Sequence, residues 1–374
     1  MFCQGATLAK KRERWYNGFN EKEGGEAMSG STTYKCPYCG GYLEFSPSQQ
    51  RFVCPYCGQS YGEGELNEQR REPAMETSME AASRGSVRGY HCQMCGAEIV
   101  VGETTAATRC YYCHNPVVLT DRLSDDFQPD GVVPFRVQKQ EAEERFKKLV
   151  EKKAFIDRDF FSTAQLEDFS GVYYPYWYGD LEGSASFEGE GKRSSRAVGP
   201  RETVITTRIY RVNREGRLQF RNMVRKALTS VDRQLSDGIH PYKLEELKDF
   251  SGAYLSGFMA ERRDVEMASA QSEMEREADN YASTLMRQGG SYDSLTGNTS
   301  FKVDKSRMRS ILLPAWVLTY RGGKDNKPFY YMMNGQTGAV CGKLPINRKK
   351  LILVAALAGG AVFVLLCLGG MLLW

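Results

Sequence analysis

The stretch Tyr34-Lys35-Cys36-Pro37-Tyr38-Cys39-Gly40-Gly41 contains the first of four Cys-x-x-Cys pairs in the chain. The pairs form two sets with the same spacing: two residues lie within each pair, and fourteen lie between the two pairs of a set. The second set begins 56 residues after the first, and such self-similarity at a fixed period indicates an internal duplication. The sets are Cys36, Cys39, Cys54 and Cys57, and then Cys92, Cys95, Cys110 and Cys113.

This spacing is typical of zinc ribbons. A Cys-x-x-Cys turn points two sulfurs at one ion, and two such turns complete a tetrahedral site of four thiolates. Because a site closed in this way has no open position for water, we expect two structural Zn²⁺ ions. Stable disulfides are one alternative, which the cytoplasmic location predicted below disfavours. Redox chemistry is the other, but a thioredoxin-like site needs only one pair.

Glycine follows the second cysteine in three of the four pairs, at Gly40, Gly58 and Gly96. A tight turn at this place tolerates a positive φ, which glycine adopts without a steric penalty. His114 takes this place in the fourth pair and could compete as a ligand, although Cys113 completes the set without it.

The N-terminal third is not basic. Residues 1–120 hold 12 Lys and Arg against 13 Asp and Glu, and eight thiolates with two Zn²⁺ ions bring the charge to about −5. A surface that binds duplex nucleic acid is basic. We therefore expect the ribbons to contact proteins.

Composition divides the chain into six parts. Residues 1–33 carry no secretory signal and are either a disordered tail or, if translation starts at Met28, an untranslated one. The other parts are zinc ribbon 1 (34–62), a polar linker (63–88), zinc ribbon 2 (89–120), an α+β domain with a basic hairpin (127–345) and a C-terminal transmembrane helix (351–374).

Periodicity predicts the mixed α+β domain. Apolar residues three and four apart predict helices over residues 140–153 and 263–287, and the second helix either packs on its own domain or docks on a helical partner. Alternating stretches predict a hairpin over residues 203–224. The residues Asp-Phe-Ser-Gly occur at 168–171 and again 81 residues later, which predicts a repeated unit of helix, turn and strand.

Positive charge is concentrated in residues 192–226, which hold 11 Lys and Arg but only 2 Asp and Glu. A cluster of this size suggests contact with a polyanion, such as anionic lipid, RNA or an acidic protein. The alternative is a solvated hairpin face. The residues proposed for polyanion binding are Arg208, Arg211, Arg217, Arg221 and Arg225.

The C-terminal run 351–374 contains no charged residue. As a helix it would be about 36 Å long, enough to cross a hydrocarbon core of roughly 30 Å. Arg348, Lys349 and Lys350 precede the run and should remain in the cytoplasm. We therefore expect a tail-anchored, single-pass protein of a bacterial cell membrane with a cytoplasmic N-terminus.

Catalysis has little support in the sequence. The chain has three histidines, His91, His114 and His240, and two of them lie beside ribbon cysteines. No HExxH, GxSxG or P-loop motif is present. We expect a protein that is not an enzyme.

Four segments together resemble a known family. They are residues 34–41, Cys95-Gly96-Ala97-Glu98, Pro134-Phe135 and Tyr331-Met332-Met333-Asn334-Gly335-Gln336-Thr337-Gly338. They are similar to the bacterial membrane-anchored zinc-ribbon proteins of TFIIB type, some of which are labelled primosomal-helicase-like. The resemblance implies metal binding by the eight cysteines, no catalytic residues, and partners of the SPFH-domain or phage-shock type.

The function expected from the sequence is that of a zinc-ribbon scaffold that recruits protein partners to the membrane, in a membrane-stress response. The alternative is a nucleic-acid-binding zinc-ribbon protein that uses the basic segment 192–226. The two differ in salt dependence, because binding to nucleic acid releases counterions and weakens steeply with salt.

Overall fold

The computed structural model describes residues 31–68, 88–102, 104–110, 113–123, 127–152, 169–199, 202–290, 292–322, 327–342 and 348–372. Over these residues strands dominate: eleven form one mixed sheet, three a small sheet and two a hairpin. The predicted α+β class is therefore wrong. The physical reason is that residues 170–198, 203–226 and 294–322 form very long continuous strands rather than short strands alternating with helices. The hairpin predicted over residues 203–224 is instead part of one of these strands.

The large sheet follows one path with three strands off it. The path is β1 (Ser31–Thr32), β8 (Pro116–Leu119), β7 (Thr105–Arg109), β13 (Met259–Glu261), β10 (Ser170–Val198), β14 (Ser294–Gly322), β15 (Lys327–Asn334) and β16 (Val340–Gly342). The others are β11 (Thr203–Lys226), which pairs with β10, β9 (Gly131–Val132), which pairs with β14, and β12 (Lys248–Asp249), which pairs with β9.

The short sequence repeat does not produce a structural repeat in the described residues. Residues 166–168 of the first copy lie outside them. Phe169 is followed directly by β10, whereas Phe250 is followed by the 3₁₀ turn Gly252–Leu255. Both phenylalanines contact the same core, so the shared residues reflect burial rather than a common fold.

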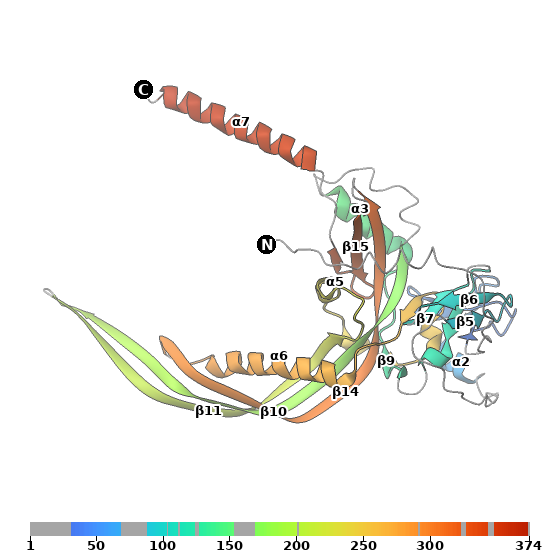
Figure 1. Cartoon of the computed structure of the whole chain (residues 1–374), viewed down its shortest axis with the longest axis horizontal. Coiled ribbons are helices and arrows are strands. Elements are labelled where there is room, and N and C mark those ends of the chain that lie inside the picture. Colours follow the sequence, from blue (N-terminus) through green and yellow to red (C-terminus); the bar gives the residue numbers. More distant parts are fainter. Residues whose placement is uncertain are drawn as a thin grey trace.

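Strands β10, β11 and β14 form a long curved arm that extends from the body of the molecule (Figure 1). β10 and β14 each contain 29 residues and β11 contains 24. At about 3.3 Å per residue, the longest strands extend about 95 Å. Gly183 and Gly189 of the central strand permit close packing, because a Cβ at either would lie 2.3 Å or less from a carbonyl oxygen of β14.

Helix α6 (Met267–Arg287) lies along the concave side of the arm (Figure 1). Its buried side chains recur every fourth residue, which places them on one stripe facing the strands. They are Ala270, Met274, Ala278, Ala282 and Met286. The helix predicted over residues 263–287 thus packs on its own chain.

Two β-bulges keep apolar side chains of the arm facing α6. Arg221 and Asn222 of β11 lie opposite Asp180 alone, and Asn222 has a φ of 60°. Before this bulge the even-numbered residues of β11, such as Phe220, face α6, and after it the odd-numbered Met223 does so. Because strand side chains alternate between faces, each extra residue exchanges the two faces. A second bulge does the same in β14 between residues 303 and 305.

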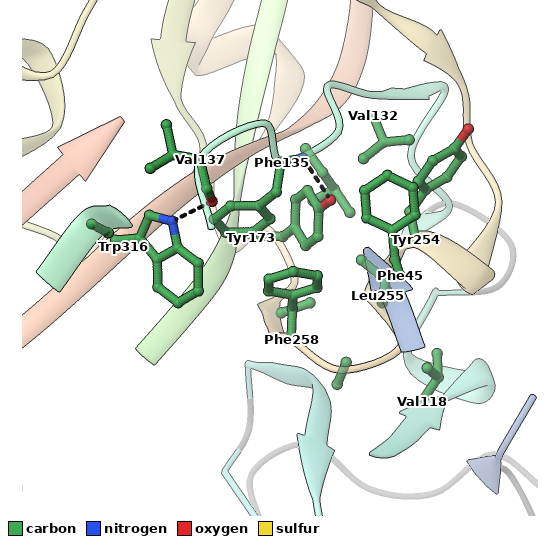
Figure 2. Packing of buried hydrophobic residues seen from close by; sticks show 14 of the residues in the cluster. Phe45, Val118, Val132, Phe135, Val137, Tyr173, Tyr254, Leu255, Phe258 and Trp316 are labelled. Carbon is green, nitrogen blue, oxygen red and sulfur yellow. Dashed lines mark hydrogen bonds between the residues drawn. The ribbon is translucent and has the colours of Figure 1, made fainter. Parts of the chain in front are cut away.

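Aromatic residues fill the core of the body, where the arm begins (Figure 2). Phe135 stacks on Phe258 with ring centroids 4.2 Å apart, and Tyr173 and Trp316 pack around this pair. The Trp316 indole N–H donates to the carbonyl of Val137 at 3.0 Å. Helix α3 (Lys139–Glu151) covers this core with Phe146 and two further apolar side chains.

A hairpin joins β15 to β16 at the end of the domain, and its turn runs from Gly335 to Gly338. Asn334 is fully buried; its amide donates to the carbonyls of Ile239 and Pro241, and its oxygen accepts from two turn N–H groups. The amide of Gln336 bonds both backbone groups of Lys243. These two side chains therefore tie the hairpin to the segment that follows α5 (Arg233–Gly238).

Helix α7 (Arg348–Leu372) follows the sheet. Within the residues that the structure describes, no helix is long and apolar enough to cross a membrane. This finding contradicts the predicted transmembrane helix and, with it, the predicted single-pass location in a bacterial membrane.

Candidate metal centres

The fold brings the eight cysteines of the two sequence sets into two clusters. Within each cluster all four sulfurs lie within 4.8 Å of one another. The Sγ–Sγ distance is 3.6 Å for Cys36–Cys57 and 3.5 Å for Cys39–Cys54, and the matching distances in the second cluster are 3.6 and 3.7 Å. A tetrahedral ion with metal–sulfur bonds near 2.3 Å needs sulfurs about 3.8 Å apart. Both clusters therefore have the geometry of a metal site, and the sulfurs are too far apart for disulfides.

The four turns that carry the cysteines share one backbone structure. In each, the residue after the second cysteine donates its N–H to the carbonyl of the first, as Gly40 does to Cys36 at 2.9 Å. That residue has a left-handed φ in all four turns: 73° at Gly40 and Gly58, 75° at Gly96 and 57° at His114. The duplication seen in the sequence is thus a duplication of structure.

His114 serves the fourth turn through its backbone and lies outside the group of sulfurs that could hold an ion. The next residue, Asn115, donates its side-chain amide to the Cys113 sulfur at 3.0 Å. Burial alone would raise the pKa of Cys113, but hydrogen bonds from the Asn115 side chain and backbone lower it to about 6. A thiol with a lowered pKa is already a thiolate near neutral pH, which is the form that binds a metal.

Both ribbons are joined to the body. In ribbon 1, strands β2 (Glu44–Ser46), β3 (Arg51–Val53) and β4 (Ser60–Tyr61) form the small sheet, whose Phe45 and Phe52 pack on Tyr254. Helix α2 (Glu63–Glu68) follows in what was predicted as the linker, and Tyr254 donates to Glu63 at 2.8 Å. The rest of that linker, residues 69–87, lies outside the described residues.

Ribbon 2 combines the hairpin β5 (Arg88–His91) and β6 (Glu98–Val101) with strands of the large sheet. Strand β7, which leads to Cys110, pairs with β13 of the body, and β8 follows Cys113 and pairs with β1. The second metal cluster is therefore built into one end of the main sheet.

The two ribbons differ in what their turns expose. In ribbon 1 the sequence Cys-Pro-Tyr-Cys occurs in both turns, and its tyrosines Tyr38 and Tyr56 are 77% and 67% exposed. Tyr42 packs edge-on against Tyr56 with centroids 5.3 Å apart. In ribbon 2, by contrast, the place of Tyr38 is taken by Met94, which is half-buried against the core of its own ribbon. The repeated Pro-Tyr was the available signal for this exposed pair, and sequence reasoning assigned it no role.

The five arginines proposed for polyanion binding do not form one site. Arg225 pairs with Glu277 of α6 and is 18% exposed. Arg208 lies on the concave face near the tip of the arm, whereas Arg211, Arg217 and Arg221 are exposed on the convex side. Arg211 lies directly opposite Glu190 of β10, so part of its charge is balanced locally.

A hollow of about 610 Å³ lies on the convex face of the arm, between the strands that carry Glu188, Arg211 and Thr299. Glu188 and Glu190 line it, and both are exposed to solvent. Carboxylates used in general acid–base catalysis are generally tuned by burial or by a close charged neighbour. Neither carboxylate is buried, and the neighbour of Glu190 is the exposed Arg211, whose charge is screened by solvent, so this hollow does not have the character of an active site.

Comparison with known proteins gives one relative. No family model matches the chain, and no solved structure matches it. A protein of Bacillus subtilis (strain 168) described as uncharacterized protein YdjG is similar to it, with 29% identity over 256 residues. The match covers 66% of this chain and 73% of that protein.

Proposed function

We propose that this protein is a scaffold that binds protein partners and that two structural Zn²⁺ ions stabilise its binding head. Sulfur-only donor sets favour zinc among the common biological cations. Four thiolates leave no position for water or substrate, so each ion would hold turns in place rather than react. The embedding of both ribbons in the body supports a structural role.

The observation that carries the proposal is the exposed tyrosine pair of ribbon 1. Tyr38 and Tyr56 project from turns that a metal ion would hold rigid, and Tyr42 adjoins them. A large aromatic side chain left in water gains free energy when a partner covers it, and tyrosine is enriched among the residues that dominate protein interfaces. The residue of ribbon 2 that corresponds to Tyr38 is Met94, which is half-buried against the core of its own ribbon, and this supports a specialised surface on ribbon 1.

The test uses the full chain and the partner classes that the family resemblance suggests, purified SPFH-domain and phage-shock-type proteins. We expect one of them to bind, and the double variant Tyr38→Ala/Tyr56→Ala to weaken binding at least about tenfold while retaining two zinc ions. Tyr281→Ala is the matched control, because it removes an exposed tyrosine on α6. If the double variant binds as well as the control does, the tyrosine pair is not the binding surface. Nucleic acid bound in place of protein would favour the alternative function.

A further inference from the structure

The tip of the arm extends beyond strand β14 and helix α6, which support the rest of the arm (Figure 1). Strand β14 begins at Ser294, opposite Lys192, and α6 ends near Gly297, whose carbonyl accepts from Arg287 at 2.9 Å. Beyond this level residues 193–198 of β10 pair with residues 203–208 of β11 alone. We call this two-stranded ribbon the tip. On the described residues its β10 edge has no neighbouring strand.

The chain already places one carboxylate on this open edge. The backbone of Asp293 donates to the Lys192 carbonyl at 2.8 Å, and its side chain accepts from the N–H of Ser194. Because the backbone groups of alternate strand residues point to the same side, those of Arg196 and Val198 also point to the open edge. A strand that continued the line of β14 would therefore find N–H and C=O groups ready to pair.

Positive charge at the tip is not balanced. The tip and the residues next to it, 192–199 and 202–209, hold four Lys and Arg but one glutamate. Arg193 and Arg208 lie directly opposite each other on the concave face, and both are exposed. Like charges directly opposite each other repel and destabilise the sheet. A carboxylate bound between or beside the two arginines would reduce this repulsion.

The convex face of the tip is apolar as well as basic. Val198, Ile205 and Ile209 are 74%, 65% and 62% exposed, and the register places Ile205 beside Arg196. Exposed β-branched residues on an uncovered strand are an aggregation hazard unless something covers them. A second copy of the chain is a poor candidate, because it would bring two basic edges together.

We propose that the tip docks an extended, acidic segment of a partner protein, which adds to β10 in the line of β14. Main-chain hydrogen bonds to Arg196 and Val198 supply affinity, as in other cases of strand addition. The side chains of the added strand alternate between the faces, so its carboxylates meet Arg193 on the concave face, while apolar residues cover Val198 on the convex face. This inference rests on the proposed function and specifies the chemistry of one partner.

The probe is a labelled ten-residue peptide of alternating glutamate and valine, titrated with the full-length protein by fluorescence anisotropy. Two variants separate charge from backbone pairing. Arg193→Glu reverses a charge, and Val198→Pro removes one edge N–H, which points away from β11 and so leaves β10–β11 pairing intact. We expect each variant to weaken binding at least about tenfold. Arg221→Glu, the same charge change lower on the arm, should have a much smaller effect.

A peptide with proline in place of valine keeps the charge but cannot add as a strand, and we expect it to bind at least about tenfold more weakly. Equal binding of both peptides, or full binding by Val198→Pro, would overturn strand addition and leave a general charge contact. Tighter binding of a single-stranded oligonucleotide than of the peptide would overturn the assignment to a protein partner. The Tyr38→Ala/Tyr56→Ala variant should bind the peptide normally, so failure of the head proposal and failure of the tip proposal can be told apart.

Discussion

Arg214 provides the sharpest test of how the arm and its helix support each other. From β11 its guanidinium reaches past the end of α6 and donates to the carbonyls of Met286, Gln288 and Gly289 at 2.6, 2.7 and 2.6 Å. The last carbonyls of a helix have no partners within the helix and carry the negative end of its dipole. We therefore predict that Arg214→Met, which keeps the apolar stem, loosens the last turn of α6.

The magnitude follows from these contacts. A hydrogen bond to a charged group contributes about 1.5–3 kcal/mol when buried and less when water competes, and two of these three are exposed. A total of about 2 kcal/mol for the three bonds is a reasonable expectation. Since 1.4 kcal/mol corresponds to a factor of ten, local opening of the last turn should increase about 30-fold.

Hydrogen exchange followed by mass spectrometry on peptides covering residues 280–290 measures this opening directly. The matched control is Arg217→Met, which removes an exposed arginine from the opposite face of the same strand. The reasoning fails if exchange in the last turn of α6 is unchanged in Arg214→Met, or if the control variant raises it equally.

Three further predictions address other parts of the molecule. Cys92→Ser should reduce the metal content from two zinc ions to one per chain by elemental analysis and speed hydrogen exchange in β7 and β8, whereas retention of both ions would contradict the ligand assignment. Asn334→Ala leaves several buried backbone groups unpaired and should cost about 2–4 kcal/mol by urea unfolding, against under about 0.5 kcal/mol for the exposed Asn213→Ala. Partial burial raises the pKa of Glu246, but hydrogen bonds from Gln336 and Arg136 outweigh it and lower the pKa. Above the unfolded-state pKa of about 4.3, the ionised Glu246 therefore stabilises the fold, and this contribution is lost as the pH falls through its lower folded-state pKa. Below about pH 4 the free energy of unfolding should therefore fall less in Glu246→Gln than in the wild type. An identical fall in both proteins would refute this.

The metal clusters were predictable because they are local. Two residues between paired cysteines and a glycine after them fix a turn whatever surrounds it, and the same left-handed turn recurs at His114. Helix α6 was predictable for a similar reason, because small and apolar residues recur every fourth residue within one continuous segment.

The arm was not predictable, because its strands are stabilised by partners far away in the chain. Residues 177–191 contain glycines and exposed charges that read as turns between short strands. Gly183 and Gly189 instead let a neighbouring strand approach closely, and this depends on residues more than 100 positions later. The bulge at Asn222 also conceals the alternation on which a strand prediction relies.

The Asn-Gly-Gln-Thr-Gly segment was visible as a distinctive motif, but its purpose was not. Asn334 and Gln336 bond to the backbone of residues 239–243, which no local pattern connects to them. The segment therefore has a structural role in joining the hairpin to the body.

The two bulges have a consequence for how this arm could change in evolution. Each bulge sets which side chains of the outer part of its own strand, β11 or β14, point outward, independently of the sequence beyond it. Loss of one residue at a bulge would rotate the outer half of that strand by half a period without altering any side chain in it. A single codon deletion at the β11 bulge could thus exchange the two faces of residues 203–220, whereas the same deletion in a helix would only rotate its face by about 100°.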